Sequence, residues 1–76
     1  RAISTAEIAI FFREMASDEV NVSLRSRGGL NVAEFARIHG GGGHHNAAAC
    51  RLRGSLSEVV EKILKAAEDF IVGGLQ

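Results

Sequence analysis

Apolar and polar residues alternate with the two-residue period of β-strands over much of the first third of the chain. Residues 19–26 show the period most clearly, because Val20, Val22 and Leu24 all fall on one side of this segment. Its other side carries Asn21, Ser23 and Arg25. Residues 6–14 are rich in Ile and Phe on both sides, which indicates a central strand. Residues 15–18 form a predicted turn, and so short a connection favours an antiparallel hairpin.

Two later segments have the longer period of helices. Residues 31–39 place their apolar side chains on one stripe, with Asn31 as the N-cap and Glu34 as its capping-box partner. Gly40 then stops this helix in a left-handed conformation. Residues 55–71 carry a longer apolar stripe and begin with the capping box Ser-Leu-Ser-Glu. The sequence therefore predicts a short helix and a long one.

Residues 47–52 form a third predicted strand, by context more than by composition. The sequence thus predicts one small domain over residues 1–76, of the α/β class with α+β character, in the order β-β-α-β-α. We expect a mixed sheet of at least three strands with both helices on one face. The crossover through residues 31–39 should make strands 19–26 and 47–52 parallel neighbours. The polar face of the sheet then has no second layer within the chain, so a ligand or another layer must use it.

Composition and charge exclude some classes of function for this chain. The nine basic and nine acidic side chains give no net charge, whereas a general nucleic-acid coat is basic. Five of the seven arginines nevertheless lie between residues 25 and 53, which permits a locally positive surface. No apolar run approaches the roughly 18 residues of a membrane span. Cys50 has no partner for a disulfide, which suits a reducing cytoplasm, and its apolar neighbours indicate a buried structural residue. Because the chain begins with Arg1 rather than Met, we expect a piece of a longer protein.

The segment Gly40–Asn46, Gly-Gly-Gly-Gly-His-His-Asn, is the least ordinary part of the chain. Without Cβ atoms the backbone can approach a ligand closely, and successive amides can form a nest that binds an anion. A flexible connector between a helix and a strand explains the run equally well. The run is not a Walker loop, because neither Lys-Ser nor Lys-Thr follows it and the next element is not a helix.

Basic side chains lie on both sides of this run. By strand parity Arg25 and Arg27 share the polar face while Ser26 turns inward, and paired guanidinium groups suit phosphate or carboxylate. Solvated charge at the edge of a sheet is the alternative. His44 and His45 can donate hydrogen bonds to phosphate oxygens or base edges.

A metal site is not predicted in this chain. His39 lies on the apolar stripe of its helix, where a partly buried histidine is favoured over a ligand. His39, His44 and His45 have no carboxylate or second cysteine near them in the sequence. The chain also lacks a paired nucleophile and base, so we expect no catalysis from it alone.

Three stretches, in this order, resemble the first subfamily of the DHH-associated C-terminal domain. They are Val-Ser-Leu-Arg-Ser-Arg at 22–27, Gly-Gly-Gly-Gly-His at 40–44 and Asn-Ala-Ala at 46–48. The resemblance spans about residues 6–71, and its glycine–histidine part is the most specific. Together the stretches look most like the nanoRNase and phosphoadenosine-phosphate phosphatase branch of the DHH-family phosphoesterases, or its cyclic-dinucleotide phosphodiesterase relatives. Two positions depart from the pattern: His45 stands where Lys is common, and Ala49 where Gly is common.

This resemblance implies the substrate-binding half of an enzyme with two domains. An N-terminal DHH catalytic domain of the same chain would hold two manganese ions, and the active site would form in the cleft between the domains. The implied substrates are short RNA or nucleotides. The resemblance leaves open whether the protein forms a homodimer. The substrate-binding residues that it implies are Arg25, Ser26, Arg27, Gly41, Gly42, Gly43, His44, His45 and Asn46.

Other functions stay open from the sequence. Related domains occur in alanyl-tRNA synthetases and single-strand exonucleases, so a nucleic-acid-binding or assembly module without hydrolysis is the main alternative. A small structural domain with a flexible glycine loop is the third. If the protein is a phosphoesterase, the sequence does not distinguish among nanoRNA, phosphoadenosine phosphate, a cyclic dinucleotide and polyphosphate as its substrate.

Overall fold

A computed structural model describes residues 1–4, 7–16 and 18–74 of the chain. Both helices and the three longer strands lie where the sequence predicts them, although Ala6 and Ser17, which belong to the predicted first strand and turn, lie outside the described residues. The elements are β1 (Ala2–Ser4), β2 (Ile8–Met15), β3 (Glu19–Ser26), α1 (Val32–Ile38), β4 (Gly42–His44), β5 (Ala47–Arg53) and α2 (Leu56–Gly74).

The strands form one five-stranded sheet in the order β1-β2-β3-β5-β4, in which every neighbouring pair is antiparallel. The predicted class is confirmed, but the expected mixed sheet is wrong. β3 and β5 are adjacent as expected, yet they run antiparallel, with Arg25 opposite Ala47. The reason is β4: after α1 the chain runs along this strand and reverses at His45 and Asn46 before it enters β5.

The two strands that sequence reasoning missed, β1 and β4, have three residues each. Three residues are too few to establish a period of two. β4 consists of Gly-Gly-His and lacks the β-branched and aromatic residues that favour strands. Pairing with β5 therefore decides its conformation, rather than its own composition.

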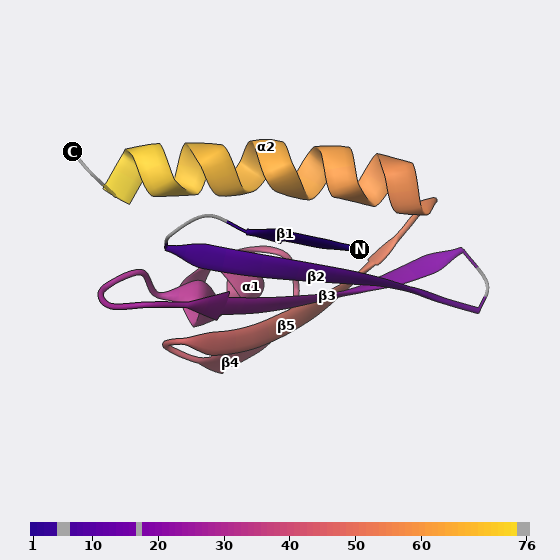
Figure 1. The fold of residues 1–76 in the computed structure, drawn as a ribbon. Coiled ribbons are helices and arrows are strands. Elements are labelled where there is room, and N and C mark those ends of the chain that lie inside the picture. The colour runs from indigo at the N-terminus through magenta and orange to yellow at the C-terminus, as the bar shows by residue number, and fades with distance from the viewer. Residues whose placement is uncertain (5–6, 17, 75–76) are drawn as a thin grey trace.

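Both helices lie on one face of the sheet, with α2 running along it in Figure 1. The Phe35 ring of α1 meets the Phe70 ring of α2 at a centroid distance of 5.3 Å, so the helices also pack on each other. The strand residues under them are all apolar, and the core contains no buried polar or charged residue of the described chain. Those strand residues are Ile8, Ile10, Phe12, Val20, Val22, Leu24, Ala48 and Cys50.

The predicted N-caps of both helices and the predicted stop of α1 are confirmed, whereas α2 extends to Gly74, three residues beyond its predicted end. The Glu34 amide donates to the Asn31 side chain at 3.1 Å, and Gly40 follows α1 with a φ of 85°. At the start of α2, Ser55 and Glu58 form a reciprocal capping box through their side chains and amides. Neither helix of the described chain is long and apolar enough to cross a membrane.

Candidate substrate-binding site

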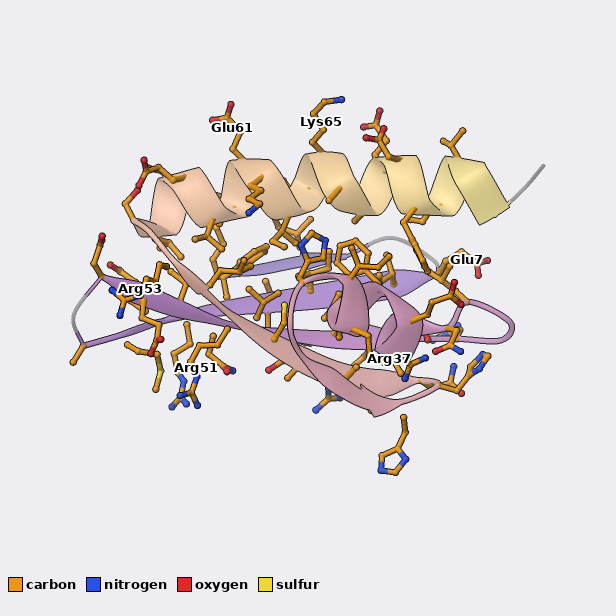
Figure 2. The ribbon with its side chains drawn as sticks, turned by 180° about the vertical axis from the view of Figure 1, so that it is seen from behind. Glu7, Arg37, Arg51, Arg53, Glu61 and Lys65 are labelled. Carbon is orange, nitrogen blue, oxygen red and sulfur yellow. The ribbon has the colours of Figure 1, made fainter. Side chains whose placement is uncertain are left out.

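The face of the sheet that turns away from the helices is uncovered, as the polar side of residues 19–26 predicts. We call it the open face. Figure 2 shows Arg51 extending from this side, whereas Glu61 and Lys65 extend from the outer surface of α2. Residues paired across antiparallel strands project to the same face, so the register defines rows that run across the sheet. From one end to the other, the four rows are Ala9–Arg25–Ala47–His44, Ala2–Phe11–Ser23–Ala49–Gly42, Arg13–Asn21–Arg51 and Met15–Glu19–Arg53.

The first row brings together two side chains that the sequence singles out. Arg25 pairs with Ala47, and Ala47 pairs with His44, so Arg25 and His44 project to one face two strand spacings apart. That separation is about 10 Å between backbones. Both side chains are exposed, and only the methyl group of Ala47 stands between them. The Arg25 Nη1 donates to its own neighbour, the Leu24 carbonyl, at 2.9 Å.

The glycine run is neither a flexible connector nor a nest. The Gly40 amide donates to the Arg37 carbonyl and the Gly41 amide to the Ala36 carbonyl, so both already have partners within the fold. A Cβ at Gly41 would lie 2.1 Å from the Ala49 carbonyl oxygen. Close approach of the chain to β5 therefore requires glycine there.

The next two glycines belong to β4, where successive amides point in opposite directions rather than converging. Gly43 resembles Gly41, because its Cβ would lie 2.6 Å from the Ala47 carbonyl oxygen. Gly42 differs, because a Cβ built there meets nothing within 4 Å. It pairs with Ala49 on the open face, so packing within the chain does not explain the glycine at this position.

Ser26 and Asn46 join the end of β3 to the turn between β4 and β5. The Asn46 side-chain amide donates to the Ser26 hydroxyl at 3.0 Å and to the Gly28 carbonyl at 3.3 Å. The Ser26 hydroxyl donates to the Leu30 carbonyl at 2.7 Å, and the Ser26 amide donates to the Asn46 carbonyl. These bonds fix the tip of the hairpin beside the first row. They give both residues a structural role, and their contact with substrate stays a prediction.

Arg27 and His45 are exposed at the same end of the sheet. Arg27 lies one residue beyond β3, where strand alternation no longer fixes the direction of its side chain. The His45 carbonyl accepts from the Val32 amide at 2.8 Å, which occupies one of the free amides at the start of α1. The backbone of His45 thus anchors the turn while its ring stays in solvent.

Sequence reasoning missed three side chains of the open face: Phe11, Arg13 and Arg51. The strand 6–14 is apolar on both sides, so Phe11 resembles a core residue in the sequence, yet it is 46% exposed. Arg13 shares its parity, which would have placed both on one face. The partner of Arg51 across the sheet depends on the antiparallel register of β5, which the expected parallel pairing did not provide.

Two titratable groups lie away from the open face. Burial, and secondarily the positive charge of Lys62, lowers the pKa of His39. Cys50 is buried, as predicted, and this burial raises the pKa of its thiol. Across residues 1–4, 7–16 and 18–74, no three His, Cys, Asp or Glu side chains gather closely enough to hold a metal ion. The described residues therefore do not fit a metal centre.

Comparison with known proteins finds relatives that are 36–38% identical to this chain. A bifunctional oligoribonuclease and PAP phosphatase NrnA of Mycoplasma genitalium is 38% identical over 65 residues, which cover 83% of this chain and 20% of that protein. The protein of the same name from Thermus thermophilus is 36% identical over 70 residues, covering 91% of this chain and 21% of that protein. The cyclic-di-AMP phosphodiesterase GdpP of Bacillus subtilis is 36% identical over 77 residues, covering 97% and 12%.

The chain thus spans about a fifth of the length of the first two relatives, and less of the third. The family model of the DHHA1 domain matches residues 1–73, nearly the whole chain. The chain therefore belongs to the DHHA1 domain family.

Proposed function

We propose that this domain holds the phosphate and nucleotide part of a short oligoribonucleotide for a manganese-dependent phosphoesterase of the DHH family. The observation that carries the proposal is the first row of the open face, where Arg25 and His44 flank Ala47. A guanidinium and an imidazole at this separation can both reach one phosphate, or a phosphate and the base edge beside it. The names of the relatives, two oligoribonucleases and a cyclic-dinucleotide phosphodiesterase, support this substrate class.

The surroundings of the row suit an anion. No carboxylate of the described chain belongs to the first or second row. Gly42 and Ala49 keep the neighbouring surface low, so that a ligand can lie flat against the sheet. Gly41 and Gly43 hold β4 close to β5 and thereby set the position of His44. In this proposal Ser26 and Asn46 act by fixing the turn, while Arg27 and His45 are available to a longer ligand.

Catalysis is assigned to another domain. Because the described residues of this chain do not fit a metal centre, we derive no step of hydrolysis from them. In the proposal, an N-terminal DHH domain of the same protein supplies the manganese ions and the attacking water. This domain contributes the position of the substrate, which lowers the entropic barrier to reaction.

The test is titration of the chain with adenosine monophosphate, followed through backbone amide NMR shifts. We expect the largest shifts at residues 25–27 and 40–47. Arg25→Ala and His44→Ala should each weaken binding about ten- to a hundredfold, because a charge-assisted hydrogen bond contributes about 1.5–3 kcal/mol. Arg37→Ala on α1 removes the same charge on the opposite side of the sheet from the row and serves as the matched control. Shifts confined to α2, or equal losses in all three variants, would contradict the assignment.

Coupling between the two residues sharpens this test. If Arg25 and His44 contact one phosphate, the double variant should lose less than the product of the two single losses, since coupled contacts are not additive. Fully multiplicative losses would place the two side chains on separate groups of the ligand.

A further inference from the structure

The third row of the open face repeats the arrangement of the first. Arg13 and Arg51 flank Asn21 there, two strand spacings apart, as Arg25 and His44 flank Ala47. Both arginines are exposed, and within the described chain neither guanidinium group makes a hydrogen bond or an ion pair. Two unpaired guanidinium groups that project to one face form a second position for an anion.

Phe11 stands between these two cationic rows. Its neighbours in the second row are Ala2, Ser23, Ala49 and Gly42, all smaller than the ring. The ring is 46% exposed, although a phenylalanine on a strand is usually buried. An exposed ring that rises above a low surface, with cations on both sides, has the form of a platform on which a base stacks.

We propose that the open face binds a single strand of nucleic acid across three rows, with a base on Phe11 and a further phosphate on Arg13 and Arg51. This inference rests on the proposed function, because the first row supplies the starting phosphate. It extends the proposal to a second phosphate position and a base position, and so makes oligonucleotides, rather than single nucleotides, the preferred ligands.

Charge favours this occupant. The chain is neutral overall, yet among the described residues the rows of the open face carry Arg13, Arg25, Arg51 and Arg53 against a single carboxylate, Glu19. Glu19 lies in the fourth row opposite Arg53 and offsets it. The positive surface therefore extends over the first three rows and ends at the fourth, which limits the length of strand that the face can hold.

The spacing of the rows sets that length. Arg25 and Asn21 are four residues apart on β3, so the first and third rows lie about 13 Å apart. A stacked strand advances about 3.4 Å per nucleotide, so about four nucleotides span the two rows, and fewer do so when the strand is extended. Mononucleotides can occupy one row only.

The experiment compares adenosine monophosphate with a linear oligoadenylate of four nucleotides, each titrated into the chain and followed by amide NMR shifts. We expect the tetranucleotide to bind at least about tenfold more tightly and to shift residues 11–13, 21 and 51 as well as the first row. Phe11→Leu, which keeps the side chain apolar but removes the ring, should weaken tetranucleotide binding about fivefold. It should leave the binding of tripolyphosphate, which has no bases, unchanged.

Salt dependence tests the arginines separately. In the double variant Arg13→Gln, Arg51→Gln, the slope of log K against log salt for the tetranucleotide should fall by about 0.7, the value for one phosphate contact to a single strand. Arg37→Gln on α1 and Ile38→Ala, which removes another exposed apolar side chain, should change neither slope nor affinity. Melting curves of each variant report whether the fold is retained.

The outcomes separate this inference from the proposed function. If binding of adenosine monophosphate depends on Arg25 and His44 but the tetranucleotide binds no more tightly than adenosine monophosphate, the second and third rows are not part of the site. If Phe11→Leu weakens tripolyphosphate as much as the tetranucleotide, the ring does not stack with a base. If Arg25→Ala and His44→Ala leave the affinity for adenosine monophosphate unchanged, the proposed function fails regardless of the result for the tetranucleotide.

Discussion

The two faces of the sheet obey different rules although the same strands build both. The strand side chains that meet the helices are apolar and mostly buried. Apart from Phe11 and Met15, the side chains in the rows of the open face are small or polar, and all of them are half-buried or exposed. Adjacent residues such as Leu24, which is fully buried, and Arg25, which is exposed, belong to opposite faces. The covered face therefore specifies the fold through its core packing. The residues of the open face are not constrained by that packing and can serve ligand binding.

The largest expected effect comes from breaking the covered face. Leu24→Ala should destabilise the chain by about 2–5 kcal/mol, because it removes buried methyl groups and leaves a cavity in a closed core. Arg25→Ala, one residue away, should change stability by no more than about 0.5 kcal/mol. Urea unfolding of both variants beside the wild type measures the contrast.

A small domain has little stability to lose, so Leu24→Ala can prevent folding altogether. Ile10→Val on the same face then replaces it, with an expected loss of about 0.5–1.5 kcal/mol. Comparable losses from Arg25→Ala and from the core variants would show that the open face also carries stability, and would remove the distinction between the faces.

A smaller effect separates two glycines of one run. Gly41→Ala should cost about 1–3 kcal/mol, since its Cβ would overlap the Ala49 carbonyl and force β4 away from β5. Gly42→Ala should leave the unfolding free energy almost unchanged, because its Cβ meets nothing within 4 Å. The same substitution should nevertheless weaken ligand binding, because the added methyl group stands on the open face. Equal melting temperatures for the two variants would contradict the packing explanation of Gly41.

Much of the fold follows from sequence pattern, and the reasons are local. The alternation in residues 19–26 fixes which side of β3 is buried, and the capping residues Asn31 and Ser55 mark the helix starts. The open face itself follows from that alternation. The direction of β5 does not, because it depends on whether β4 exists, and a Gly-Gly-His segment carries no strand signal of its own.

The site shows the same division between local and non-local information. Arg25 and His44 are conspicuous in the sequence, whereas their position in one row depends on register across three strands. From the sequence the glycine run fits a nest and a flexible connector equally well, whereas contacts with β5 account for Gly41 and Gly43, and only a folded chain reveals those contacts. In the sequence Phe11 resembles a core residue. The pattern of one strand does not show which face of the sheet lacks a covering layer, so it cannot show that the Phe11 ring is exposed.

The smallest expected effect tests the covered side at its margin, where His39 closes the end of α1. Its half-buried ring lies 4.7 Å from that of Phe35, and burial followed by the charge of Lys62 lowers its pKa below the ordinary 6.5. The folded chain then binds fewer protons at this site than the unfolded chain, so its contribution to stability is present above pH 6.5. It is lost as the pH falls through the lower folded pKa.

Urea unfolding between about pH 7.5 and 5 should therefore show a decline in unfolding free energy that is shallower in His39→Gln. Lys62→Gln offers a finer measurement, because it removes the secondary cause and retains the burial. The pKa of His39, followed by NMR of its ring protons, should rise in that variant but stay below 6.5, since burial is the larger cause. A full return of the His39 pKa to 6.5 in Lys62→Gln would show that the charge of Lys62 is the larger cause. An identical decline in unfolding free energy in the wild type and in His39→Gln would assign the acid sensitivity to carboxylates elsewhere.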